Sequence, residues 1–452
     1  MSFLNRILRR TKSPRVVFIG IDGTPLSFLQ RMMREGVMPN LARLAAEGDL
    51  RENLSVYPTV SSVAWSSFMT GVNPAKHGIY GFVDRQLDSL RPYIPNAANM
   101  KAKTLWEVLS EAGKRVLVMN VPVTYPPRPV NGVLVGCFLS PSLEKATYPP
   151  EASGELAKLG YILDVDPWAA RRDKAGLLRQ VNQALAGRER ALFHYMDQEP
   201  WDYAHLHIME TDRLHHFLWE EMEAGDPQFA PGFIGFYHEL DAFLGRLRDR
   251  LDEQTTLMLM SDHGFCTLRQ EVYINHWLAS QGWLRYATEQ PKSVADIHPE
   301  SVAYSLDPGR VFLNVRGREP HGRISRGAEY ERVRDEIIAA ARELRDPATG
   351  EPMIQHAFRV EEIYHGPYLD QAADIILHPY NGYDLKGPIA KETLTYKGRE
   401  LVGMHTYDDA TLYIGGHRII QEQPWVADPM PTILRLLGVP IPPDVDGRVL
   451  IA

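Results

Sequence analysis

The sequence predicts an α/β fold in which helices cover both faces of a mostly parallel central sheet. Short apolar runs, typical of strands buried on both faces, alternate with helical patterns at the spacing of βαβ units. Aspartate and histidine residues directly follow several of these runs, and open α/β sheets build their sites at the carboxyl ends of their strands. The chain has 452 residues, 44% of them hydrophobic, which is enough to bury a large core.

The first predicted strand covers residues 16–21 and ends just before Asp22. Thr24 and Pro25 are typical of the N-cap and first residue of a helix, so we expect a helix to follow directly. A second helix is predicted at residues 41–47 and ends at the glycine that follows it.

The segment 57–71 predicts an extended entry and then a helix that opens at Ser61 or Ser62 and ends at Gly71. A hydroxyl group at a helix N-terminus lies beside free backbone N–H groups, which suit a phosphate oxyanion. Taken alone, Ser61 is better explained as an N-cap. The aspartates and histidines elsewhere in the chain are what make it a candidate nucleophile.

The rest of the first 265 residues continues the alternation of strands and helices. A capping box starts one helix, and a proline-rich loop covers residues 122–150. The further predicted elements are a helix beginning at Thr104 and Glu107, strands at 116–121, 133–135, 203–208 and 255–260, and helices at about 172–197 and 233–251.

Carboxylates and imidazoles gather just after the predicted strands. Asp212 and His216 are four residues apart, so on a helix they share one face and can bind one ion. A last candidate ligand, His405, precedes another strand-like run at 410–414. The full set of Asp and His candidates is Asp22, Asp212, His216, Asp262, His263 and His405.

Residues 266–400 supply no candidate metal ligand, and a helix is predicted there at about 328–344. Arg316 and Arg318 are candidates to contact the non-reacting part of an anionic substrate, because arginine binds phosphate in a bidentate manner. A solvated hairpin is the alternative interpretation of this charged cluster.

In their order along the chain, these motifs resemble the alkaline phosphatase superfamily. They are most similar to the type I phosphodiesterase/nucleotide pyrophosphatase branch and its bacterial phosphohydrolase and phosphomutase relatives. The resemblance implies a three-layer sandwich with an inserted cap. It divides the chain into a flexible basic tail (1–14), a catalytic core (15–265 and 401–452) and a cap-like insertion (266–400). The motifs that carry it are Gly20-Ile21-Asp22-Gly23, Ser61 with Ala64-Trp65 and Thr70-Gly71, His77-Gly78-Ile79, Asp212 with His216, Asp262-His263-Gly264, His405, and the tail from Pro431 to Gly447.

The resemblance also implies two metal ions. One ion would be held by Asp212, His216 and His405, and the other by the remaining ligands, which are Asp22, Asp262, His263 and the hydroxyl oxygen of Ser61. Carboxylate, imidazole and alkoxide donors suit Zn²⁺ or Mn²⁺ better than Ca²⁺. The implied activity is phosphoester hydrolysis through a phosphoserine intermediate.

Two positions depart from the pattern of this branch, which usually has threonine where this chain has Ser61 and asparagine at the position of Phe82. No arginine or lysine can be placed beside Ser61 from the sequence, which favours diesters over more highly charged monoesters. A phosphomonoesterase or phosphomutase is the alternative. A non-catalytic binding protein would require lost ligands, and all six Asp and His positions are filled.

Composition limits the partners. The net charge of −8 and the lack of a long basic run after residue 15 argue against a nucleic-acid partner. Two cysteines in so long a chain favour a reducing compartment, and hence the cytoplasm. No apolar run approaches the roughly 20 residues of a membrane span. The basic tail could contact a membrane surface weakly or lie free in solvent, and the oligomeric state stays open.

Overall fold

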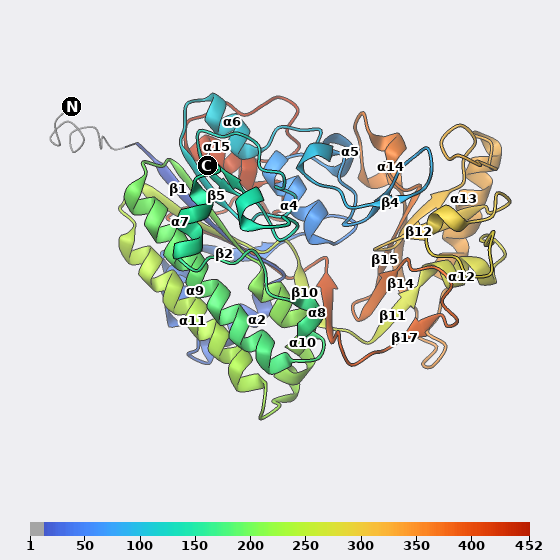
Figure 1. Ribbon diagram of the computed structural model, residues 1–452, viewed down its shortest axis with the longest axis horizontal. Coiled ribbons are helices and arrows are strands. Elements are labelled where there is room, and N and C mark those ends of the chain that lie inside the picture. The colour runs from blue at the N-terminus through green and yellow to red at the C-terminus, as the bar shows by residue number, and fades with distance from the viewer. Residues whose placement is uncertain (1–12) are drawn as a thin grey trace.

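The computed structural model describes residues 13–452, and its central element is an eight-stranded sheet (Figure 1). Five neighbouring strands at its centre are parallel, and antiparallel pairs lie only toward the two edges. The prediction of a mostly parallel sheet is therefore confirmed. From one edge to the other, the strands are β2 (Gly48–Asn53), β19 (Ala410–Gly415), β9 (Thr255–Met260), β1 (Arg15–Ile21), β8 (Tyr203–Ile208), β5 (Val116–Met119), β6 (Gly132–Val135) and β7 (Thr147–Tyr148).

Helices pack on both faces of this sheet, because successive strand residues point to opposite sides. In β1, Phe18 contacts Phe68 with ring centroids 4.6 Å apart, whereas Ile19 is buried in the core on the other face. The predicted three-layer architecture is confirmed. One layer contains α4 (Ser61–Thr70), α6 (Leu105–Glu111) and α15 (Pro429–Leu436); the other contains α2 (Leu26–Arg34), α3 (Pro39–Glu47), α7 (Ala152–Lys158), α8 (Pro167–Ala170), α9 (Lys174–Gln198), α10 (Glu210–Ala224) and α11 (Ala230–Arg250).

The local signals in the sequence set most helix ends. Helix α4 begins at Ser61, as predicted, and ends at Gly71, whose φ of +68° is the left-handed conformation that glycine adopts without strain. The capping box of Thr104 and Glu107 is also present. The predicted N-cap role of Thr24 is wrong: α2 starts at Leu26 without a side-chain cap, since the Thr24 hydroxyl donates to the backbone oxygen of Asp22 at 3.3 Å.

The chain between β10 (Gly264–Thr267) and β18 (Gly403–Thr406) forms a second lobe with its own buried apolar core. Because β10 and β18 pair with each other, the chain leaves and returns at one place. We interpret this lobe as the cap, and Figure 1 shows it, yellow to orange, beside the layers of the core. Its elements are β11 (Gln270–Tyr273), α12 (Ile274–Ser280), β12 (Ala303–Leu306), β13 (Arg310–Leu313), α13 (Ala328–Arg342), β14 (Ile354–Arg359), α14 (Val360–Ile363), β15 (Ile375–Pro379), β16 (Tyr383–Lys386) and β17 (Thr395–Tyr396).

A hairpin of the core reaches back onto the cap. It consists of β3 (Asp84–Arg85) and β4 (Pro92–Tyr93), and it follows the short helix α5 (Pro74–His77). Arg85 Nε donates to the Tyr304 hydroxyl at 3.0 Å, and Leu90 of the hairpin is buried in the apolar core of the cap. The cap is therefore held to the core at this hairpin as well as at β10 and β18.

None of the helices in the part of the chain from residue 13 onward is both long and apolar enough to cross a membrane. The first twelve residues of the predicted basic tail, and with them the proposed contact with a membrane surface, lie outside the described residues.

Candidate metal centre

All seven residues predicted to form the metal site meet at the carboxyl edge of the central sheet. Strand β1 lies between β8 and β9, so the residues that follow these three strands are brought side by side. Asp22 follows β1, and Asp262 with His263 follows β9. The other predicted residues reach the same edge from the first two turns of α10 (Asp212 and His216), from the N-terminus of α4 (Ser61) and from β18 (His405).

Two overlapping groups of ligand atoms lie close enough to hold an ion each. The atoms of Asp212, His216 and His405 lie within 4.8 Å of one another, as do those of Asp22, Asp212 and His263. Ser61 Oγ adjoins the second group, since it donates to Asp22 Oδ1 at 3.1 Å and lies 3.2 Å from His263 Nε2. Asp212 thus belongs to both groups, whereas the sequence analysis assigned it to one ion only.

The imidazoles of this cluster are oriented as metal ligands are. The Nδ1 atoms of His216, His405 and His263 face the backbone oxygens of Gly403 at 3.0 Å, Thr59 at 3.3 Å and Gly264 at 2.9 Å. A carbonyl partner places the ring hydrogen on Nδ1, which leaves an Nε2 lone pair facing the cluster. His216 Nε2 and His405 Nε2 are only 2.9 Å apart, and two facing lone pairs at this distance repel unless a cation lies near both.

Asp262 provides a second test of whether the cluster fits an ion. Its Oδ1 accepts from the backbone N–H of Gly23 at 3.2 Å. Its Oδ2 is fully buried, lies 3.4 Å from His263 Nε2, and has no hydrogen-bond partner among residues 13–452. A buried carboxylate oxygen without a partner is costly, and coordination of a cation removes that cost. The donor set therefore fits divalent ions.

The pKa values of the cluster reflect this concentration of buried acceptors. Burial, together with the Asp262 and Asp212 carboxylates, raises the pKa of Asp22 well above its usual range. Burial also raises the pKa of Asp262 to about 8. Burial alone would raise the pKa of Asp212 too, but His216 and His405 hold it well below its usual range. Burial lowers the pKa of His263 to about 4, so its imidazole is neutral near pH 7, as a metal ligand must be.

Two residues around Asp22 were not identified from the sequence. Trp65 Nε1 donates to Asp22 Oδ2 at 2.8 Å, and His207 Nε2 lies 2.9 Å from the same oxygen. The hydrogen bond from Trp65 fixes the carboxylate and leaves its Oδ1 toward Ser61. The alternation of histidines at positions 205 and 207 within an otherwise apolar strand was a usable signal, because a buried polar side chain in a central strand requires a partner.

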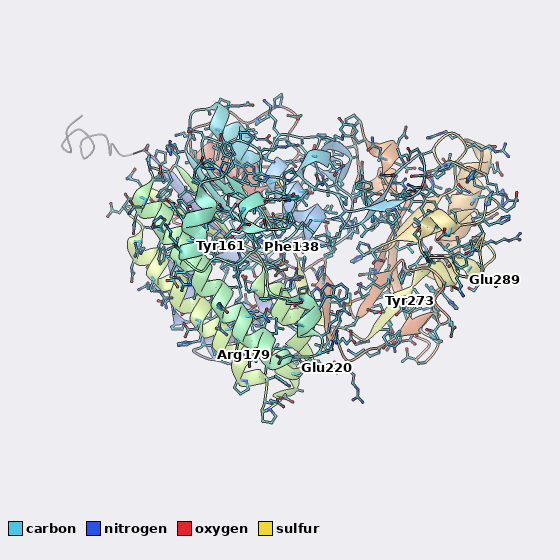
Figure 2. The ribbon with its side chains drawn as sticks, in the orientation of Figure 1. Phe138, Tyr161, Arg179, Glu220, Tyr273 and Glu289 are labelled. Carbon is cyan, nitrogen blue, oxygen red and sulfur yellow. The ribbon has the colours of Figure 1, made fainter. Side chains whose placement is uncertain are left out.

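Arg213 is a further functional candidate that the sequence analysis missed. Its side chain lines a cavity of about 290 Å³ together with Ser61, Asp212 and both histidines of the first group. Arg213 Nη2 donates to Asp164 at 2.7 Å, and the guanidinium lies 5.1 Å from the centre of the Phe138 ring, which Figure 2 labels near the middle of the molecule. Arg213 Nη1 lies 3.5 Å from Asp212 Oδ2 and has no hydrogen bond within the described part of the chain.

The two arginines predicted to bind substrate lie elsewhere. Arg318 is largely buried inside the cap, where it pairs with Asp374 at 2.6 Å and Glu319 at 2.8 Å. Arg316 is exposed on the turn just before it. Neither side chain lines the cavities that adjoin the metal cluster. In contrast, Phe82, which stands where asparagine was expected, lines both of those cavities.

Two further histidines near the cluster, His215 and His77, have structural contacts. His215 Nδ1 lies 2.8 Å from the backbone oxygen of Gly23, and its Nε2 lies 2.6 Å from the Tyr237 hydroxyl. His77 Nε2 lies 3.0 Å from Ser67 Oγ at the other end of α4 from Ser61. Both rings therefore support the segments that carry ligands without joining the cluster.

Several solved structures share the fold of this chain. Phosphonoacetate hydrolase from Sinorhizobium meliloti, solved in complex with phosphonoformate, superimposes with a TM-score of 0.66 at 18% identity, covering 94% of this chain and 96% of that one. Murine ectonucleotide pyrophosphatase/phosphodiesterase 5, solved in complex with AMP, gives a TM-score of 0.56 at 14% identity, covering 95% and 96%. The human form of the latter gives 0.56 at 15% identity, covering 96% and 97%.

Sequence comparison identifies the family. A search of curated proteins finds no match for this chain. The profile of the family described as type I phosphodiesterase/nucleotide pyrophosphatase matches residues 16–408, which include all seven residues of the candidate metal centre. Because this match spans most of the sequence, the chain belongs to the type I phosphodiesterase/nucleotide pyrophosphatase family.

Proposed function

We propose that this phosphoester hydrolase binds two divalent ions and transfers the phosphoryl group of its substrate to Ser61. The observation that carries the proposal is the position of Ser61 Oγ, 3.1 Å from Asp22 Oδ1 and 3.2 Å from His263 Nε2, at the N-terminus of α4. When bound, two ions would lower the pKa of the Ser61 hydroxyl and stabilise charge on the attacking and leaving oxygens. The donor set favours Zn²⁺, with Mn²⁺ as the alternative.

The residues of the chain account for the remaining requirements of the reaction. Ser61 Oγ loses its proton and attacks phosphorus in line with the leaving oxygen, which takes up a proton and departs as an alcohol. The product is a phosphorylated Ser61, which still carries the second alcohol when the substrate is a diester, and water hydrolyses its bond to Ser61 in a second displacement. The backbone N–H groups of Ser61 and Ser62 have no acceptor within residues 13–452 and point out of the start of α4. They are suited to hold a phosphoryl oxygen, as free N–H groups at a helix N-terminus do.

Arg213 supplies the side-chain donor that Phe82 lacks. Burial would lower the pKa of Arg213, but the carboxylates of Asp164 and Asp212 raise it, so the guanidinium stays charged. Asp164 and Phe138 fix its orientation, and Nη1 has N–H groups to spare in the cavity that Ser61 lines. We assign Arg213 the role of binding a non-bridging phosphoryl oxygen.

Arg213→Gln should lower kcat/KM by about 10- to 100-fold, which is the usual effect of losing a hydrogen bond to a charged group. Its content of bound metal should stay unchanged. With chiral phosphorothioate diesters, the preference for one diastereomer over the other should also shrink, because Arg213 contacts one of two non-equivalent oxygens. Arg171→Ala, at a half-buried arginine paired with Glu400 outside the cavity, is the matched control. An unchanged diastereomer preference would show that Arg213 only supports the fold.

Diesters are the proposed substrate class, in line with the family, and the position of Arg213 favours phosphomonoesters as the second candidate. The charge argument against monoesters rested on the lack of a cation near Ser61, and Arg213 removes that argument. Turnover of bis(p-nitrophenyl) phosphate and of p-nitrophenyl phosphate by the metal-loaded protein separates the two. The free thiols of Cys137 and Cys266 are consistent with a reducing compartment, such as the cytoplasm.

The shared position of Asp212 gives a test by metal analysis alone. His405→Ala should lower the bound metal by about half, because His405 belongs to one ligand group and Asp22, Asp262 and His263 remain. Asp212→Ala should lower it further, since Asp212 lies in both groups. Elemental analysis after dialysis measures both. Equal losses in the two variants would contradict the bridging position of Asp212.

A further inference from the structure

A second cavity, of about 250 Å³, lies between the cap and the core and adjoins the cavity of Ser61. Strand β16 of the cap contributes one wall, and residues 57–60 of the core contribute the facing wall. The two cavities share Phe82, Val83, His216 and His405. A molecule bound at Ser61 can therefore extend past the two histidines into the space beneath the cap.

The in-line geometry of the displacement determines which part of the substrate lies in the cavity beneath the cap. In an in-line displacement, the leaving oxygen stands opposite the attacking Ser61 Oγ. Ser61 adjoins the group of Asp22 and His263, so the opposite side is that of His216 and His405. Since these two histidines line the cap cavity, the leaving group projects into it.

The charges of the cap cavity exclude an anionic leaving group. Lys386 Nζ lies 2.6 Å from Asp384 Oδ2. Burial would lower the pKa of Lys386, but Asp384, Asp307 and, more weakly, Glu271 raise it. Of these carboxylates, Asp384 and Asp307 line the cavity, so one ammonium group meets two carboxylates there. Burial lowers the pKa of His378 to about 4, which leaves this ring neutral near pH 7. The net charge of these groups is negative.

The hydrogen-bonding groups of the cavity further narrow the chemical class of the leaving group. Asp384 and Asp307 accept hydrogen bonds, Lys386 donates them, and the Asn381 amide does both. Alcohol hydroxyls also donate and accept, so they match this mixture. A cationic leaving group would be attracted by the net negative charge but would have to compete with Lys386, which already pairs with Asp384 at 2.6 Å. The volume of the cavity suits a single ring or a short chain bearing hydroxyls.

We propose that the cap cavity binds an uncharged polyhydroxy leaving group, a sugar or polyol, and thereby selects phosphoesters of such alcohols. This inference rests on the proposed phosphoryl transfer to Ser61. It also gives the cap its function: residues of β16, and not the distant Arg316 and Arg318, determine the choice of substrate.

The test compares phosphoesters that differ only in the leaving alcohol, namely myo-inositol, ethanolamine and glycolate. The metal-loaded enzyme should give the highest kcat/KM with the inositol ester. Asp384→Asn should lower that value about tenfold, in keeping with the loss of a charged hydrogen bond. The same variant should raise the value for the glycolate ester, because Lys386 loses its partner. Asp370→Asn, an exposed carboxylate of the cap outside the cavity, should change neither.

A wild-type preference for the glycolate or ethanolamine ester, or an equal change for all three esters in Asp384→Asn, would overturn the proposal. If Asp384→Asn does not fold, Asp307→Asn replaces it, since Asp307 is exposed on one side. Calorimetric binding of inositol phosphate and phosphoglycolate to metal-loaded Ser61→Ala ranks the same leaving groups without turnover. Selective binding of the inositol ester without any turnover in the wild type would refute the proposed function, and the cap cavity would then bind the polyol as a ligand and not as a leaving group.

Discussion

Ser61→Ala should lower the turnover of phosphoesters by about three orders of magnitude or more, because the variant has no oxygen that can attack phosphorus. The substitution removes one atom from a side chain that is only 2% exposed and lies at the start of a helix. The fold and the Asp212, His216 and His405 group should therefore be retained. Steady-state rates measure the loss of turnover. The metal content and the thermal midpoint Tm of the same preparations show whether the ligand group and the fold are retained.

Ser61→Thr is the matched variant. Threonine supplies the same oxygen with one added methyl group, so measurable activity should remain. Ser62→Ala, at the neighbouring hydroxyl, should keep most of the activity. Near-normal turnover in Ser61→Ala would mean that water attacks the substrate directly and that Ser61 is not the nucleophile.

Removal of the bound ions by a chelator should abolish activity and change how stability depends on pH. The raised pKa of Asp262, about 8, means that the metal-free folded protein keeps a proton that the unfolded chain, with a pKa of roughly 3.9, has lost. The stability from this group is fully present below the unfolded pKa and is lost as the pH rises through about 8. Asp22, whose pKa is also raised, acts in the same direction.

Because of the buried His263, the stability of the metal-free protein tests the carboxylates only at pH values above about 6.5. The pKa of His263 is lowered to about 4, so this group adds stability as the pH rises from there toward the unfolded value of roughly 6.5, and then stops changing. Above that pH, Tm of the metal-free protein should fall up to about pH 8, whereas the loaded protein should not show this decline. Parallel Tm curves for the two forms would contradict a cation site at these carboxylates.

The sequence was sufficient to predict the sheet, the start of α4 and the gathering of the Asp and His side chains at one edge, for physical reasons. Residues 203–208 and 255–260 are short runs in which apolar residues predominate, as is typical of central parallel strands, and both strands were predicted with the observed bounds. Ser61 begins a helix that ends at a glycine, which is a local signal. Because parallel strands end at one edge, the residues that follow them had to meet.

The features that the sequence did not predict depend on contacts between segments that are distant along the chain. Nothing in the sequence around Arg213 indicates that Asp164 and Phe138 fix it beside Ser61. Arg318 looked available for substrate, but Asp374, 56 residues further on, is its partner. The cap cavity joins residues 57–60 to β16, and no local pattern specifies how two such surfaces face each other.

The central claim is that phosphorus becomes bonded to Ser61, and the most direct measurement is to map the phosphorylated residue. Metal-loaded enzyme is mixed with a phosphoester substrate, quenched with acid within the first turnovers, digested and analysed by mass spectrometry. The account predicts phosphate on the peptide that contains Ser61, located on Ser61 itself, and its absence in Ser61→Ala. Phosphate on Thr59 or Ser62, or an active enzyme that never carries phosphate, would contradict the account.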